Sequence, residues 1–154
     1  MWGLLISLTL AILIVALGGG CAGKQVACLE VSGEEPERVL TRLPVEPGVP
    51  FSLEFINSIY LAPVRETLVY EPPGGISIVM VESPSDGVFE YYGLEPDGTG
   101  KVLMHRQVGD FKLRSHDYTN HRLTVAGQAI YLKGLVPNGE PILVRVQVGA
   151  ECGM

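Results

Sequence analysis

Two polar residues stand where the sequence pattern predicts apolar side chains. In the stretch Phe51-Ser-Leu-Glu-Phe-Ile-Asn57, apolar and polar residues alternate, and Asn57 falls on the apolar face. Glu66 likewise lies between two apolar residues of its own face. A buried amide or carboxylate needs hydrogen-bond partners. We therefore expect Asn57 either to end the inner face by bonding to neighbouring backbone or to line a polar pocket. Glu66 would pair with Asn57, with Arg65 or with a ligand.

These residues define a candidate binding site. Asn57, Ser58 and Glu66 would share one polar site if their strands are neighbours, and the alternative is an internal hydrogen-bonded pair that fixes the strand register. Tyr91 and Tyr92 add aromatic rings with polar tips, which suit a binding rim, whereas tyrosines buried in a core are the alternative. The candidate binding residues are Asn57, Ser58, Arg65, Glu66, Tyr91 and Tyr92.

Catalytic and metal-binding motifs are weak in this sequence. Ser115-His116-Asp117 has the residue types of a nucleophilic triad, but adjacent residues of a strand point to opposite faces. A loop here would gather His116, Asp117 and His121 around a metal, although an ordinary turn has the same composition. The sequence has no Gly-x-Ser-x-Gly, His-Glu-x-x-His or phosphate-loop motif. We expect no enzymatic activity, no metal and no cofactor. The alternative is a hydrolase or metal-dependent enzyme that uses Glu66, His105, His116 or His121.

The N-terminal segment 1–23 has the properties of an export signal or membrane anchor. It carries no charged residue, and 4–17 is almost wholly apolar. As a helix, that run would be about 21 Å long, which is shorter than the roughly 30 Å hydrocarbon layer and favours a signal peptide. Three glycines then precede Cys21, as in bacterial lipoprotein signals, although Leu17 stands one position further from the cysteine than is usual. Lipidation at Cys21, an uncleaved anchor and a soluble secreted form remain open.

All three alternatives place the rest of the chain outside the cytoplasm, and anchoring would hold it at the cell membrane. The chain has three cysteines, Cys21, Cys28 and Cys152. If acylation takes Cys21, an even pair remains for an oxidising compartment. A disulfide between Cys28 and Cys152 and a pair of free thiols are the two alternatives.

Composition predicts one folded domain over 24–154. The chain has 154 residues, with 11 Lys+Arg against 17 Asp+Glu, and a formal net charge of −6. Such a chain lacks the basic surface that binding to a run of phosphates requires, so a nucleic-acid partner is not expected. Because 47% of its residues are hydrophobic, the chain is not a disordered tail.

Short alternating segments between glycine- and proline-containing turns predict an all-β fold. About eight to ten short strands would form an antiparallel β-sandwich or barrel after the hydrophobic signal or anchor helix. The Asn138-Gly139 pair predicts a tight hairpin turn. The expected strands are 38–43, 51–55, 64–70, 76–82, 102–107, 111–115, 122–125, 129–135 and 142–148.

Several of these segments together resemble a family of small exported proteins called DUF1850. The resemblance lies in Phe51-x-Leu-x-Phe-Ile-Asn-Ser-Ile59, Pro63-Val-x-Glu66, Gly74-Gly-Ile-x-Ile78 and Gly93-Leu-x-Pro96. It extends over roughly 28–148, and the order and spacing of the motifs agree with the family. Asn57 stands where the family usually has histidine.

The resemblance implies a function at the membrane. Genes of this family often lie beside those of TRAP transporters of the TAXI type. It therefore implies a membrane-tethered, extracytoplasmic, non-enzymatic domain that works with a TAXI-type TRAP permease or its solute-binding protein, as an accessory or in contact with the solute. A purely structural envelope lipoprotein is a further alternative.

Overall fold

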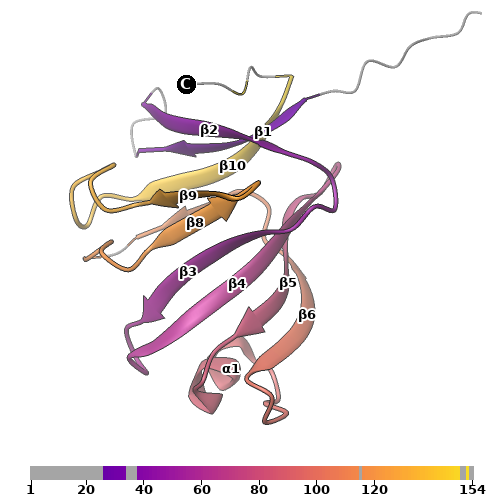
Figure 1. The fold of residues 1–154 in the computed structure, drawn as a ribbon, viewed down its shortest axis with the longest axis vertical. Coiled ribbons are helices and arrows are strands. Elements are labelled where there is room, and N and C mark those ends of the chain that lie inside the picture. The colour runs from indigo at the N-terminus through magenta and orange to yellow at the C-terminus, as the bar shows by residue number, and fades with distance from the viewer. Residues whose placement is uncertain (1–25, 34–37, 115, 150–151, 153–154) are drawn as a thin grey trace, which may run out of the picture.

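The computed structural model describes residues 26–33, 38–114, 116–149 and 152 (Figure 1). Segment 1–23, with Cys21, and also Ser115 lie outside the described residues, so the predicted signal, anchor and lipidation stay predictions. No helix in the described part is long and apolar enough to cross a membrane.

The described chain forms two antiparallel sheets, which confirms the all-β prediction. The four-stranded sheet has the order β2-β1-β10-β7, and the six-stranded sheet has the order β6-β5-β4-β3-β8-β9. Each sheet ends in two edge strands, so the fold is a pair of open sheets and not a closed barrel. The strands are β1 Ala27–Ser32, β2 Val39–Val45, β3 Phe51–Asn57, β4 Ala62–Glu71, β5 Gly75–Glu82, β6 Lys101–Gln107, β7 Phe111–Leu113, β8 Arg122–Val125, β9 Gln128–Tyr131 and β10 Ile142–Val148.

One hydrophobic core joins the two sheets. Leu29 and Val144 of the four-stranded sheet belong to the same buried cluster as Leu53, Leu68 and other residues of the six-stranded sheet. These side chains recur at every second position of their strands, as the pleat of a strand requires. The alternation in the sequence therefore identifies the faces that meet in the core.

The structure corrects the expected elements at three places. Strand β1 was not predicted, and neither was helix α1, Asp86–Tyr92. Strand β9 ends at Tyr131, so the predicted strand 129–135 is too long. In β1 apolar and polar residues do alternate over Leu29-Glu30-Val31-Ser32, but a run of four residues is a weak signal in the sequence, and the residues of both faces are buried. The helix has only seven residues, too few for a helical period to stand out in the sequence.

The predicted hairpin at Asn138-Gly139 is wrong. The turn is present, since the Glu140 N–H donates to the Pro137 carbonyl at 3.1 Å. However, β9 and β10, which flank it, belong to different sheets. The tight hairpin between paired strands lies instead at Ala126-Gly127, where both residues have the positive φ of a type I′ turn, 49° and 78°.

Strand β1 carries a buried carboxylate on the face that points away from the core. Glu30 is 1% exposed, and its oxygens accept hydrogen bonds at 2.8 Å from Nε of Arg42 on β2 and Nε of Arg145 on β10. Both arginines are directly opposite Glu30 in the strand register. Burial alone would raise the pKa of Glu30, but the hydrogen bonds and charges of the two arginines bring the pKa below its ordinary value.

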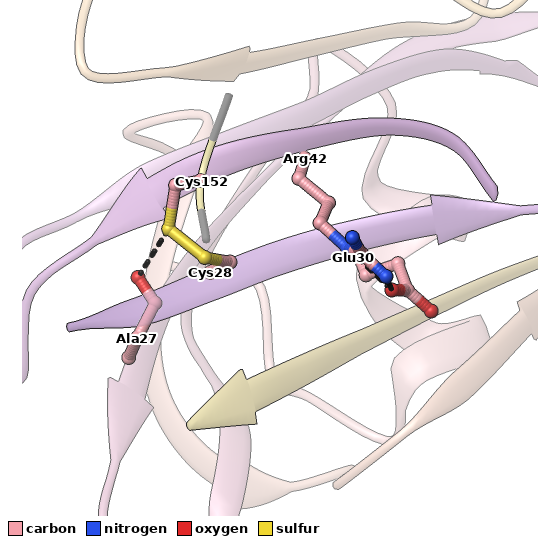
Figure 2. Close-up of a disulfide and its surroundings, with 5 residues drawn as sticks. All are labelled: Ala27, Cys28, Glu30, Arg42 and Cys152. Atoms are coloured by element: carbon pink, nitrogen blue, oxygen red, sulfur yellow. Dashed lines mark hydrogen bonds and ion pairs between the residues drawn. A yellow bond between two sulfur atoms is a disulfide. The ribbon is translucent and has the colours of Figure 1, made fainter. Parts of the chain in front are cut away.

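A disulfide lies on the same face of β1. The structure joins Cys28 to Cys152, 124 positions further along the chain, and the Cys152 sulfur lies 3.5 Å from the Ala27 carbonyl oxygen (Figure 2). Cys28 and Glu30 are two residues apart, so they share a face. The disulfide and the two arginines together cover the outer side of β1.

We expect Glu30→Gln to lower the free energy of unfolding by about 3 kcal/mol, because it leaves the two arginines without their buried counterion. Urea denaturation of the purified full-length protein measures this loss. The stabilisation by the Glu30 carboxylate is present above the ordinary glutamate pKa and disappears as the pH falls through the lowered pKa. Acid should therefore destabilise the wild type more than the variant.

Glu54→Gln is the matched control for this prediction. Glu54 also lies between two arginines, Arg65 and Arg122, on neighbouring strands of the six-stranded sheet, but its side chain is 22% exposed. Solvent weakens such a pair, so we expect the control to lose less than about 1 kcal/mol. Equal losses in the two variants would contradict the special role of Glu30.

Candidate functional site

A cleft of about 440 Å³ brings together most of the predicted binding residues. Its walls come from the end of β3, from β4, β6 and β7, and from the C-terminal turn of α1. Asn57, Ser58, Glu66, Tyr91 and Tyr92 line it. Residues that are up to 35 positions apart in the sequence therefore share one site.

Asn57 ends β3 and shapes the loop at the mouth of the cleft. Its side chain is buried, and its Oδ1 accepts hydrogen bonds from the N–H groups of Ile59 at 2.9 Å and Tyr60 at 3.0 Å. This is the first of the two arrangements expected for Asn57, and the residue also lines the cleft. Asn57 is opposite Ala62 in the register, and its oxygen bonds to backbone and not to Glu66.

Glu66 is held by helix α1. Its carboxylate accepts a hydrogen bond from the hydroxyl of Tyr92, and Arg106 on β6 donates to the Tyr92 carbonyl at 2.7 Å. Burial raises the pKa of Glu66, while the Tyr92 hydrogen bond and the charge of Arg106 offset part of that rise. Burial and the neighbouring Glu66 charge also raise the pKa of Tyr92, so its hydroxyl keeps its proton and acts as a donor.

Helix α1 is fixed at both ends. Gly93 adopts a left-handed conformation with φ of 70°, and the N–H groups of Gly93 and Leu94 donate to the carbonyls of Glu90 and Phe89, a C-terminal cap that ends the helix. Near the N-terminus, a Cβ on Gly87 would lie 2.4 Å from the ring of Tyr60. The absence of a side chain at Gly87 therefore lets the loop after β3 pack against the helix.

Three cations in the cleft lack an ion-pair partner. Among the basic residues that the structure describes, six are ion-paired with glutamates: Arg38, Arg42, Arg65, Lys101, Arg122 and Arg145. Within the same part of the chain, Arg106, Lys112, Arg114 and Lys133 form no ion pair, and the first three line the cleft. Lys112 and Arg114 are exposed. The cleft of this acidic protein therefore has an excess of positive charge that favours an anion.

Arg65 does not belong to the cleft. It is adjacent to Glu66 on β4, so its side chain points to the opposite face of the sheet. There it forms an ion pair with Glu54 at 3.1 Å. The structure therefore separates Arg65 from the other five predicted binding residues.

His121 also lines the cleft, whereas the other two histidines lie elsewhere. Its ring stacks on Phe55 with centroids 5.8 Å apart, and burial lowers its pKa, although Asp117 opposes the shift. His116 lines an adjoining hollow, and His105 pairs with Glu71 at 2.8 Å. Over the described ranges, no three His, Cys, Asp or Glu side chains lie close enough together to hold a metal.

A smaller, mainly apolar pocket adjoins the cleft. It has a volume of about 190 Å³, and Phe55, Glu66 and Leu113 line both spaces. The other lining residues of this pocket are Leu53, Leu68, Ile78, Val108 and Phe111. Glu66 therefore lies at the boundary between a polar cleft and an apolar interior.

The sequence did not single out Arg106, Lys112 and Arg114 as site residues. A signal existed for two of them, since Lys112 and Arg114 alternate with Phe111 and Leu113 and must share a face of their strand. Nothing in the sequence shows that this face borders β3 and α1. Comparisons with protein-family models, with curated proteins and with solved structures gave no match.

We expect Tyr92→Phe to lower the free energy of unfolding by about 1–2 kcal/mol, because Glu66 loses its hydrogen-bond donor. The Tyr92 hydrogen bond lowers the pKa of Glu66 against the effect of burial, so its removal raises this pKa further, and the loss should grow as the pH rises and Glu66 ionises. Urea denaturation at pH values from about 4 to about 8 measures both effects, because carboxylates and histidines ordinarily titrate in this range.

Tyr91→Phe is the control, because Tyr91 is 62% exposed and should change stability by less than about 0.5 kcal/mol. Adding Glu66→Gln to Tyr92→Phe should remove the pH dependence. If that dependence persists in the double variant, Glu66 is not its source.

Proposed function

We propose that this protein is a non-enzymatic, membrane-tethered domain on the outer side of the cytoplasmic membrane. In this proposal it serves a TAXI-type TRAP transporter as an accessory or solute-contacting partner. The observation that carries the proposal is the convergence of Asn57, Ser58, Glu66 and Tyr92 in one cleft with three unpaired cations. Asn57, Ser58 and Glu66 belong to the motifs through which the sequence resembles the DUF1850 family.

The disulfide supports an extracytoplasmic location. Cys28 and Cys152 lie near the two ends of the domain, and their bond closes almost the whole folded chain into one loop. Disulfides of this structural kind persist in oxidising compartments and are rare in the cytosol. In the chain-entropy treatment, a loop of this length stabilises a fold by about 4–5 kcal/mol.

The position of the cleft is consistent with a tether at the N-terminus. Figure 1 shows the start of β1 at one end of the domain, with α1 at the opposite end. A chain held at the membrane through its N-terminal segment would therefore present the cleft away from the bilayer. There it is accessible to a solute or to a soluble binding protein.

For anchoring, we expect the mature protein to be found with membranes. Mass spectrometry of the membrane fraction should show either a diacylglyceryl group on Cys21 or an intact Met1. Cys21→Ser should release the protein only in the lipoprotein case, because the uncleaved anchor does not depend on this cysteine. Recovery of the whole population as soluble, unmodified protein would contradict anchoring by either route.

For the transporter role, we expect Glu66→Gln to leave the melting temperature nearly unchanged but to reduce solute uptake in cells and co-purification with the permease or its solute-binding protein. The substitution keeps the shape of the side chain and removes its charge. Arg65→Gln is the control, because Arg65 is a neighbour in the sequence but points away from the cleft. Wild-type uptake and co-purification by folded Glu66→Gln would remove Glu66 from the site.

A further inference from the structure

The three unpaired cations line the cleft from both sheets. Lys112 is on β7, Arg114 follows that strand, and Arg106 is on β6. Six of the other described basic residues already have a glutamate partner within 4.0 Å. An anion entering the cleft therefore meets guanidinium and ammonium groups that need not give up an existing ion pair. One N–H of Arg106 donates to the Tyr92 carbonyl at 2.7 Å, and the other N–H groups of this guanidinium can still donate to an anion.

The adjoining pocket has the opposite character. Leu53, Leu68, Ile78 and Phe111 line it, and among its lining residues Glu66 alone has a charged side chain. A second anionic group placed here would lose its hydration without meeting a hydrogen-bond donor. It would also meet the Glu66 carboxylate. The pocket therefore accepts an apolar group and disfavours a second negative charge.

We propose that the cleft and this pocket form one binding site for a small organic anion that has a single carboxylate head and an apolar body. The head binds among Arg106, Lys112 and Arg114, and the body lies between the two sheets, next to Phe55 and Leu113. Dicarboxylates are disfavoured because their second head would be buried beside Glu66. This assignment rests on the proposed solute-contacting role of the same cleft, and it specifies the chemistry of the solute.

Four probes with related carbon chains test the assignment. Pentanoate has one carboxylate and an apolar chain, glutarate has a carboxylate at each end, pentan-1-ol has no charge, and acetate has almost no chain. Full-length protein in lipid nanodiscs is titrated with each probe, and the amide resonances of residues that line the cleft are followed by NMR. We expect saturable shifts with pentanoate, and an affinity at least about tenfold lower for each of the other three probes.

Variants of the unpaired cations test where the carboxylate head of the ligand binds. Lys112→Gln and Arg114→Gln should each weaken pentanoate binding by about tenfold, the effect of losing one charge-assisted hydrogen bond. Lys133→Gln is the matched control, since Lys133 also lacks an ion pair within the described residues but does not line the cleft. We expect the control to bind pentanoate as the wild type does. An equal loss in the control would show a nonspecific effect of net charge and would overturn the assignment of the head.

Each remaining outcome also decides the assignment. Equal affinity for glutarate would overturn the single-head restriction, and equal affinity for pentan-1-ol would overturn the anionic head. No saturable shift with any probe would overturn the assignment of a ligand to this cleft. The proposed transporter role would then still be judged by uptake and co-purification of Glu66→Gln, which need no knowledge of the ligand.

Discussion

The burial of Glu30 is the constraint on which the four-stranded sheet depends. An ionised carboxylate that is 1% exposed is tolerated only if opposite charges and hydrogen bonds compensate it. Arg42 and Arg145 supply both from the two neighbouring strands. A slip of either strand by one residue would move its arginine to the other face of the sheet. Glu30 therefore helps to fix the register of three strands at once, including β1 and β10, which are far apart in the sequence.

The register of the four-stranded sheet also determines where some residues of the candidate site lie. Strand β10 pairs with β7, so that Val144, next to Arg145, is opposite Phe111. The position of β7 decides where Lys112 and Arg114 emerge. Tyr118 then fixes the following loop, because its buried hydroxyl lies 2.6 Å from the Glu140 carbonyl oxygen and 3.1 Å from that of Leu113. Lys112 and Arg114 are thus positioned by the sheet that does not carry Asn57 or Glu66, whereas Arg106 lies on β6 of the six-stranded sheet.

In both sheets a glutamate lies between two arginines of the neighbouring strands, and the cleft departs from this pattern. Glu54 repeats the arrangement of Glu30 in the six-stranded sheet, between Arg65 and Arg122, although in a more exposed place. Six of the ten described lysines and arginines form ion pairs with glutamates, and five of these pairs join neighbouring strands. The departure is the cleft, where Glu66 bonds to Tyr92 and leaves the neighbouring cations without a partner within ion-pair distance. Residues that break a local rule in this way are expected at functional sites.

The sequence by itself determined the fold class, most of the strands and the polar residues of the inner faces. Strand β8 has the predicted bounds, and Asn57 and Glu66 were identified because each interrupts an apolar face. These are local signals, since alternation records which side of one strand meets the core. Only the tertiary structure decided that β1 is central, that α1 covers Glu66 and that Arg106, Lys112 and Arg114 meet at the cleft. The sequence of β1 does not show that both of its faces are buried, because its partner β10 is far away in the chain. Exposed cations on a strand likewise look alike in a sequence until long-range pairing places them beside one another.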